Sequence, residues 1–405
     1  MARTGSPSSQ PRAPCSKIVG MSQTLASPIA ARPPQTGASE RLVSLDAFRG
    51  LTIAFMILVN TPGDGRHVYW PLEHSEWHGW TPTDVVFPSF LWIAGIAITL
   101  SLGRRLARGE SRSHLLRKAA VRAAILFVLG VLIYVYPAFD LHTERILGVL
   151  QRIAICYLAS AAIFLYTRVR GQIVWIVSLM AVYWLLMAFA PVPGYGHGRL
   201  DVAGNFAHYV DRLVLGSHNY RSTKTWDPEG IVSTLPAIAT CLLGVLGGHL
   251  LAARRSIARR SQWMAGLGAL LLAAGLVCNL WLPINKKIWT DSFTLFMAGL
   301  DFVLFAGFLW LMDGLGWRRA ARPLVIMGMN AILVYLASEF VEEALSWIHW
   351  SAAGGTVTLK RWLFQQGFAG WASPYNASLA YAIAYVLAMY LFAWFLYRRR
   401  WFVRI

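Results

Sequence analysis

The stretch TDVVFPSFLWIAGIAITLSLG at residues 83–103 decides the fold. A helix needs about 20 apolar residues to cross the hydrocarbon core of a bilayer. This stretch has that length, and Asp84 is its one charged residue. It is therefore predicted to be a transmembrane helix.

Stretches of the same kind recur along the 405 residues. The other predicted spans are 45–61, 117–136, 146–166, 172–190, 231–252, 263–282, 291–312, 323–346 and 377–397. Composition agrees, because only 14% of the residues are charged, against roughly 25% in soluble domains. Residues 41–405 are therefore predicted to form an all-α, polytopic membrane helix bundle of about ten transmembrane helices.

The positive charge of the chain indicates how the bundle is oriented. The net charge of +18 could suggest a nucleic-acid partner, but the Lys and Arg residues lie in short clusters between apolar stretches. Alternate connections, counted from the N-terminus, hold 25 of the 37 Lys and Arg residues, and the other connections hold ten. Because short basic loops stay in the cytoplasm, both termini are predicted to be cytoplasmic. Residues 1–40, rich in Ser, Pro, Ala and Arg, are predicted to be a disordered cytoplasmic tail.

The first predicted span carries two opposite charges near its start. Asp46 and Arg49 are three residues apart, which places them on one helix face. They could form a structural ion pair, or Arg49 could extend toward the membrane surface. They could equally bind an anionic ligand that arrives from the cytoplasm.

The connection that follows this span carries the densest chemistry. It runs from Asn60 through YWPLEHSEWHGW at 69–80 to Asp84. His74 could take a proton from an attacking amine or hydroxyl, the Asn60 amide could stabilise an oxyanion, and the aromatic residues suit the apolar faces of a sugar. Two other readings remain: an aromatic belt at the membrane interface, or a metal site. A metal site in this connection would draw on His67, His74, His78 and Asp84.

Further polar residues cluster at the ends of other spans. Of Asp227 and Glu229, one could simply begin a helix, and Arg152 could pair structurally with an acid. Capping does not account for Arg152, Lys286 and Asn330, which all lie near spans.

These blocks together resemble the heparan-α-glucosaminide N-acetyltransferase family of transmembrane acyltransferases. The resemblance covers almost the whole chain after residue 41. The matching blocks, in order, are LDAFRG (45–50), LVN (58–60), YWPLEHSEWHG (69–79), DVVFPSF (84–90), GVLQR (148–152), PVPG (191–194), YVDRLVLG (209–216), DPEG (227–230), PINKKIW (283–289) and GMNAILVY (328–335).

The resemblance implies an all-helical membrane bundle that transfers acetyl from cytosolic acetyl-CoA to an amino sugar on the opposite side. It identifies His74 with the family's active-site His and Asn60 with its essential Asn. Whether His74 carries the acyl group covalently or acts as a base stays open. The compact chain, without a signal or sorting segment, suggests a bacterial inner-membrane member. Its His74 loop, the connection at residues 62–82, is expected to face the periplasm.

The remaining site residues follow from this hypothesis. Asp84 or Glu73 would orient His74. Arginines on the cytoplasmic side would bind the phosphates of acyl-CoA, namely Arg49, Arg104, Arg105 and Arg122. The acceptor site would be lined by Arg152, Asp227, Glu229, Asn285, Lys286 and Asn330.

The expected partners are the lipid bilayer, acyl-CoA, an amino sugar or glycan, and a second copy of the chain in a homodimer. No metal and no nucleic acid is expected. The main alternative is an inner-membrane sugar transporter, related to N-acetylglucosamine, that keeps the bundle without transferase activity.

The charge pattern makes a first prediction about topology. Reporter fusions at residue 200 and at the C-terminus should report opposite sides of the membrane, because an odd number of spans separates them. Alkaline phosphatase and fluorescent-protein activities measure the two locations. Both fusions on the same side would contradict the predicted orientation.

Overall fold

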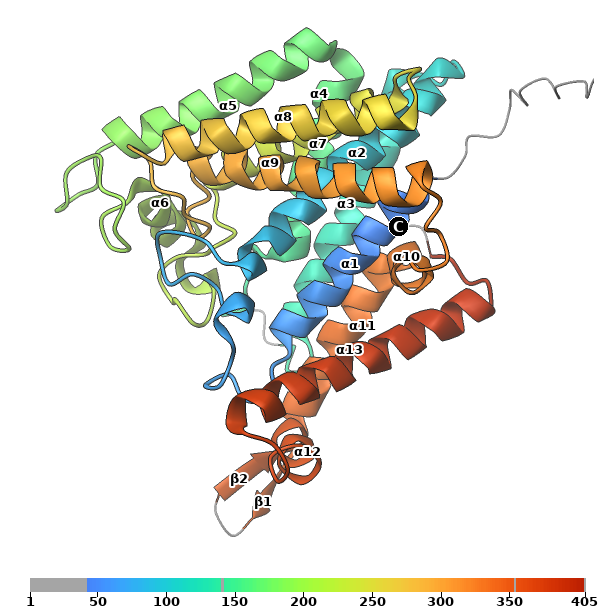
Figure 1. Ribbon diagram of the computed structural model, residues 1–405. Coiled ribbons are helices and arrows are strands. Elements are labelled where there is room, and N and C mark those ends of the chain that lie inside the picture. The colour runs from blue at the N-terminus through green and yellow to red at the C-terminus, as the bar shows by residue number, and fades with distance from the viewer. Residues whose placement is uncertain (1–41, 140–141, 353–354, 404–405) are drawn as a thin grey trace, which may run out of the picture. The chain divides into compact units, whose positions relative to one another are not determined.

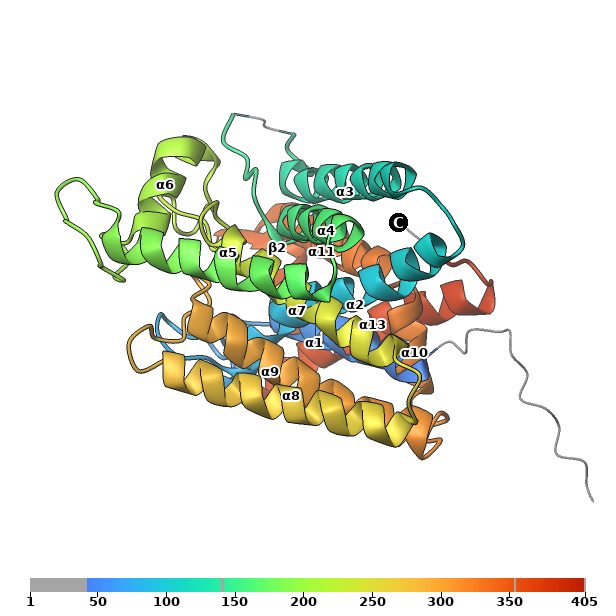
Figure 2. The same ribbon diagram turned by 90° about the horizontal axis from the view of Figure 1, so that it is seen from above.

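Long helices packed side by side make up most of the protein (Figures 1 and 2). The computed structural model describes residues 42–139, 142–352 and 355–403. The long helices and the two halves of a broken one are α1 (Val43–Asn60), α2 (Val86–Ala107), α3 (Arg112–Val135), α4 (Val149–Tyr166), α5 (Val169–Phe189), α7 (Thr234–Ala252), α8 (Ile257–Cys278), α9 (Asp291–Phe308), α10 (Arg322–Met329), α11 (Ala331–Trp347) and α13 (Pro374–Arg398).

Shorter elements occupy the connections. They are η1 (Trp70–Leu72), η2 (Pro82–Val85), α6 (Phe206–Leu215), η3 (Gly216–His218), η4 (Leu309–Gly314), β1 (His349–Ala352), β2 (Gly355–Thr358) and α12 (Leu359–Gly367). The two strands form an antiparallel hairpin in which His349 pairs with Thr358. This hairpin and α12 connect α11 to α13.

The membrane character predicted from the sequence is confirmed. Within the described residues, nine helices are long and apolar enough to cross a membrane, and the bent pair α10–α11 makes ten if it counts as one span. The prediction of an all-α, polytopic membrane bundle is therefore confirmed. The predicted tail at 1–40 lies outside the described residues, and the cytoplasmic placement of both termini stays a prediction.

Two predicted spans differ most from the structure. The span predicted at 323–346 is broken, because α10 and α11 meet at Asn330 with a bend of 78°. The Asn330 side chain fills the break by donating to the Trp401 carbonyl at 2.9 Å and accepting from the Val403 N–H at 3.0 Å. The span predicted at 263–282 begins earlier, at Ile257, where the Ser256 hydroxyl caps the helix.

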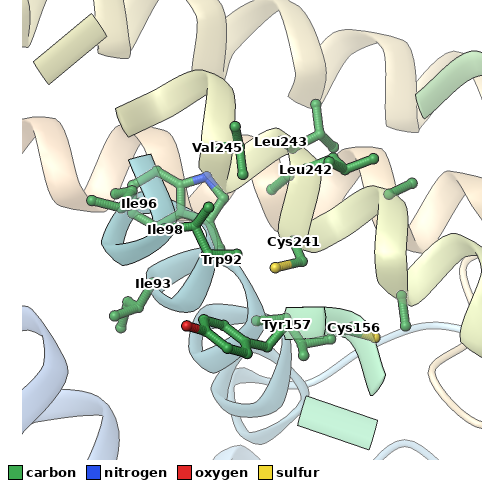
Figure 3. Packing of buried hydrophobic residues seen from close by; sticks show 14 of the residues in the cluster. Trp92, Ile93, Ile96, Ile98, Cys156, Tyr157, Cys241, Leu242, Leu243 and Val245 are labelled. Carbon is green, nitrogen blue, oxygen red and sulfur yellow. The ribbon is translucent and has the colours of Figure 1, made fainter. Parts of the chain in front are cut away.

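A dense apolar core lies where α2, α4 and α7 meet (Figure 3). Trp92 and Ile96 of α2 are fully buried in one cluster with Cys241 and Val245 of α7 and Cys156 of α4. Lipid tails are as apolar as these side chains, so close van der Waals contact rather than escape from water holds membrane helices together. The core therefore depends on how near the backbones come.

Glycines allow that close approach between α2 and α7. A Cβ atom placed on Gly244 would lie 2.0 Å from the Trp92 carbonyl oxygen, and one placed on Gly95 would lie 1.9 Å from the Cys241 carbonyl oxygen. Backbone atoms cannot move aside as a flexible side chain can. The pair Gly95–Gly244 therefore sets the distance between α2, which begins next to the His74 loop, and α7.

A matched pair of substitutions tests this contact. Gly244→Ala should destabilise the protein by about 1–3 kcal/mol, because an overpacked core must displace its neighbours. Gly266→Ala in α8 is the control, since its Cβ would meet no atom within 4 Å. Thermal unfolding in detergent measures both, and equal stability of the two variants would contradict the role of Gly244.

Candidate active site

The His74 loop is tied to η2, the short helix that leads into α2, by one carboxylate. Asp84 is fully buried, and its Oδ2 atom accepts the backbone N–H groups of Thr81 at 3.0 Å and Ser75 at 3.2 Å. Its Oδ1 atom accepts from Nδ1 of His74 at 2.7 Å. Thr81 and Asp84 also form a capping box at the start of η2. The loop is therefore folded so that His74 lies against Asp84.

This pair has the geometry of an oriented base. An ionised carboxylate can only accept hydrogen bonds, so the Nδ1 atom of His74 carries the proton and Nε2 keeps its lone pair. The His74 side chain stays 47% exposed, which leaves the imidazole within reach of a ligand. Glu73, the other residue expected to orient His74, uses its backbone carbonyl to accept from the Thr81 hydroxyl.

Lys286 reaches the same imidazole from the connection between α8 and α9. Its Nζ atom lies 3.0 Å from Nδ1 and 3.2 Å from Nε2 of His74, and 3.8 Å from Oδ1 of Asp84. The connection is held by Asn285, whose Oδ1 atom accepts the N–H of Lys287 at 2.8 Å. The structure thus brings together four of the predicted site residues: His74, Asp84, Asn285 and Lys286.

Electrostatics favours a neutral imidazole at this point. Burial lowers the pKa of His74 below its ordinary value of 6.5, and the positive charge of Lys286 lowers it further, against the opposing effects of Asp84 and Glu229. Burial also lowers the pKa of Lys286, while Asp84 and Glu229 oppose that change. His74 is therefore uncharged near neutral pH and able to accept a proton.

Asn60 lies in a different contact from the one expected. It is the last residue of α1, and its Nδ2 atom donates to Oε1 of Glu339 on α11 at 3.3 Å. Within the part of the chain that the structure describes, no hydrogen bond joins Asn60 to His74. Sequence reasoning missed Glu339, although an acid inside a predicted span is itself a functional signal.

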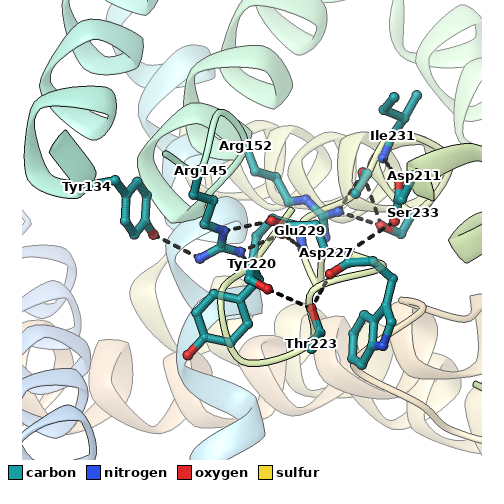
Figure 4. Close-up of polar contacts among 12 residues, drawn as sticks. Tyr134, Arg145, Arg152, Asp211, Tyr220, Thr223, Asp227, Glu229, Ile231 and Ser233 are labelled. Atoms are coloured by element: carbon teal, nitrogen blue, oxygen red, sulfur yellow. Dashed lines mark hydrogen bonds and ion pairs between the residues drawn. The ribbon is translucent and has the colours of Figure 1, made fainter. Parts of the chain in front are cut away.

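A buried ion cluster joins the connection before α4 to the connection before α7 (Figure 4). Arg145 binds both Asp227, at 2.7 and 2.5 Å, and Glu229, and its Nη1 atom donates to the Tyr134 hydroxyl at 3.0 Å. The two acids were predicted as acceptor-site residues. Their partner Arg145 was missed, because residues more than 80 positions apart in the chain leave no local pattern.

Arg152 does not form the ion pair considered for it. It is 1% exposed, and its Nη2 atom donates to the Gly230 carbonyl at 2.9 Å and to the Ser233 hydroxyl (Figure 4). Its guanidinium lies 5.2 Å from the centre of the Trp289 ring. Among the described residues, its Nε and Nη1 atoms have no hydrogen-bond partner, so two donors remain in a buried polar interior.

The four residues of the metal alternative are separated into distinct pairs. His67 contacts Asp64 at 3.0 Å, His74 contacts Asp84, and His78 lies 3.4 Å from the Asn285 amide. No group of three His, Cys, Asp or Glu side chains suited to a metal occurs within residues 42–139, 142–352 and 355–403.

Comparison with known proteins agrees with the resemblance seen in the sequence. Residues 41–276 match the profile of the heparan-alpha-glucosaminide N-acetyltransferase catalytic domain. This chain belongs to that family. Heparan-alpha-glucosaminide N-acetyltransferases of Mus musculus and Homo sapiens are each 30% identical to it, over 76% and 75% of this chain. The chain spans about half the length of these relatives, 54% and 53%.

The arginines predicted from their cytoplasmic side to bind acyl-CoA lie in the halves of α1, α2 and α3 that are farther along these helices from the His74 loop. Arg49 contacts Asp46 and the Gly328 carbonyl, each at 3.4 Å. Arg105 is bound by Glu110 at 2.7 and 2.6 Å.

The other two arginines and Asn330 complete this opposite end. Arg104 donates to the Leu100 carbonyl, and Arg122 lies 4.9 Å from the centre of the Tyr157 ring. Asn330, predicted for the acceptor site, contacts Trp401 and Val403 near the C-terminus. The contacts thus separate it from His74.

The Arg145 cluster predicts a large effect on stability. Arg145→Met leaves Asp227 and Glu229 buried without their cation, so we expect a loss of about 3–5 kcal/mol. Arg199→Met removes an exposed pair with Asp201 and should not change the stability measurably. Thermal unfolding of the purified variants measures this difference, and an unchanged Arg145→Met protein would refute it.

Proposed function

We propose that the protein is a membrane acyltransferase. It would take an acetyl or other acyl group from acyl-CoA on the cytoplasmic side and transfer it to an amino sugar or glycan on the periplasmic side of an inner membrane. Membership of the N-acetyltransferase family supports the reaction class. The excess of Lys and Arg on one set of connections supports the direction.

The observation that carries this proposal is the His74–Asp84 pair. A side chain that acts as a general base needs three properties: a fixed tautomer, the neutral, unprotonated form near neutral pH, and access to the substrate. Asp84 fixes the tautomer through a 2.7 Å contact, the lowered pKa keeps His74 neutral, and 47% exposure gives access. In this proposal His74 removes a proton from the acceptor as it attacks the acyl carbon.

The acceptor would approach at the surface around the His74 loop. Trp70 in this loop is 65% exposed, and an exposed indole suits the apolar face of a sugar ring. Glu229 faces the same interior, because its charge acts on both His74 and Lys286. Asp227 and Glu229, held by Arg145, then form a rigid polar wall rather than two separate binding groups.

The donor would bind from the opposite end. Arg49 lies in the second turn of α1 and Arg122 in the N-terminal half of α3, and Arg side chains match phosphate geometry. Arg105 is already bound by Glu110, so it would have to exchange that partner for a phosphate. Arg49 is paired with Asp46 and would have to do the same, so we assign these arginines together to acyl-CoA binding.

A transporter is the alternative, and the broken helix α10–α11 is the feature that suits it. Transporters place substrates at the free ends of broken helices. Here the break at Asn330 is occupied by the C-terminal residues Trp401 and Val403. The site at His74 is the more open one, and it favours chemistry over passage.

Two substitutions test the proposed base. His74→Ala should lower kcat for transfer from acetyl-CoA to an amino sugar by about 10²–10⁴, the range of general-base effects. Asp84→Asn should lower it as well, because an amide can stabilise the other tautomer of His74. Release of free CoA, measured with purified protein in detergent, reports the turnover.

His67→Ala is the matched control, since His67 lies in the same connection and pairs with its own aspartate, Asp64. It should keep the activity of the unsubstituted protein. Full activity of the His74→Ala variant would refute the proposal that His74 is the base. Uptake of sugar into vesicles without acyl-CoA would favour the transporter instead.

A further inference from the structure

Lys286 occupies a position that its assignment to the acceptor wall does not explain. Its Nζ atom is within 3.2 Å of both ring nitrogens of His74. An atom that close to both nitrogens lies over the face of the imidazole, because in the ring plane it would collide with Cε1, and it therefore leaves the in-plane lone pair of Nε2 open. The ammonium therefore lies within contact distance of the proton-accepting atom.

The position of this lysine is fixed by the loop that carries it. Asn285 is fully buried, and its Oδ1 atom accepts the N–H groups of Lys287 at 2.8 Å and Ile288 at 3.2 Å. The Ile284 carbonyl accepts the N–H of Gly79 at 2.7 Å, which joins the loop to the His74 connection. The Lys286 side chain is only 15% exposed.

The group expected to stabilise an oxyanion is engaged elsewhere. Asn60 was given that role, but its amide donates to Glu339. Stabilisation of a tetrahedral intermediate requires a donor about 3 Å from the developing negative charge. A substrate whose proton is within reach of Nε2 of His74 also has its reacting carbon close to Lys286. Among the described residues, the Lys286 ammonium is the cationic donor that lies next to Nε2, at 3.2 Å.

We propose that Lys286 is a catalytic residue whose ammonium group binds the acyl carbonyl oxygen during transfer. This proposal rests on the acyltransferase function proposed above. It moves the oxyanion role from Asn60 to Lys286 and leaves Asn60 with Glu339 at the end of α1.

The step balances without any further reactant. The neutral acceptor amine attacks the thioester carbon, a C–N bond forms, and the carbonyl π electrons move to oxygen, where Lys286 donates a hydrogen bond. His74 accepts the proton from the amine nitrogen at Nε2. The C–S bond then breaks, the C=O bond re-forms, and the CoA thiolate leaves and takes the proton from His74. Lys286 stays protonated throughout.

The surrounding charges suit this division of roles. Burial lowers the pKa of Lys286, and the charges of Lys287 and Arg145 lower it further, while Asp84 and Glu229 act against these effects by favouring the charged form. His74 is subject to Lys286, Asp84 and Glu229. Removing the Lys286 charge removes one cause that lowers the pKa of His74, so that pKa should rise toward 6.5. Activity that needs neutral His74 would then be lost at a higher pH as the solution is acidified.

The test compares neighbouring lysines in the full-length protein. Lys286→Met should lower kcat by about 10²–10³, the cost of removing one oxyanion donor, with little change in KM for acetyl-CoA. Its acid limb in the pH–rate profile should move to higher pH. Lys286→Arg should restore part of kcat and keep the acid limb in place. Lys287→Met is the control, since Lys287 donates to the Glu76 carbonyl and should leave both quantities unchanged.

The outcomes separate this inference from the proposed function. If His74→Ala loses activity while Lys286→Met retains the kcat and pH profile of Lys287→Met, the role of Lys286 is refuted and the acyltransferase proposal stands. If His74→Ala is fully active, the proposed function itself fails. Should Lys286→Met not fold, as judged by thermal unfolding, Lys286→Arg decides: an acid limb displaced to higher pH would overturn the proposal.

Discussion

The burial of the Asp84 carboxylate is the constraint on which the site depends. A buried carboxylate is costly unless donors surround it, and Asp84 is completely buried at the start of a membrane-spanning helix. The donors come from the connection that precedes it: the backbone N–H groups of Ser75 and Thr81 and the ring of His74. The orientation of His74 is therefore a consequence of satisfying Asp84.

The second half of the site depends on helix packing. Lys286 comes from the connection between α8 and α9, and α9 packs against α2 and α7. The close contact at Gly95 and Gly244 fixes how α2 and α7 lie. The hydrogen bond from Gly79 to Ile284 then joins the two connections directly. The distance between His74 and Lys286 thus follows from contacts made inside the apolar core as well as in the loops.

The sequence predicted the spans well because apolar length is a local property. The 83–103 stretch corresponds to η2 and α2, and Asp84 was expected to orient His74. The break at Asn330 escaped prediction because it contains no proline and its stabilising partners, Trp401 and Val403, are more than 70 residues away. Arg145 was missed for the same reason. The residue types and the matching sequence blocks indicated which chemistry the site could perform. The contacts between distant connections could be found only from the three-dimensional structure.

Glu229 links the ion cluster to the proposed base. Burial raises its pKa, but the charges of Arg145, Arg152 and Lys286 outweigh burial and hold that pKa below its ordinary value. Glu229 is therefore ionised, and its charge in turn favours the protonated forms of both Lys286 and His74. Arg145 fixes where this charge lies. The Arg145 cluster is thus part of the electrostatic surroundings of His74, although no hydrogen bond among the described residues joins the two groups.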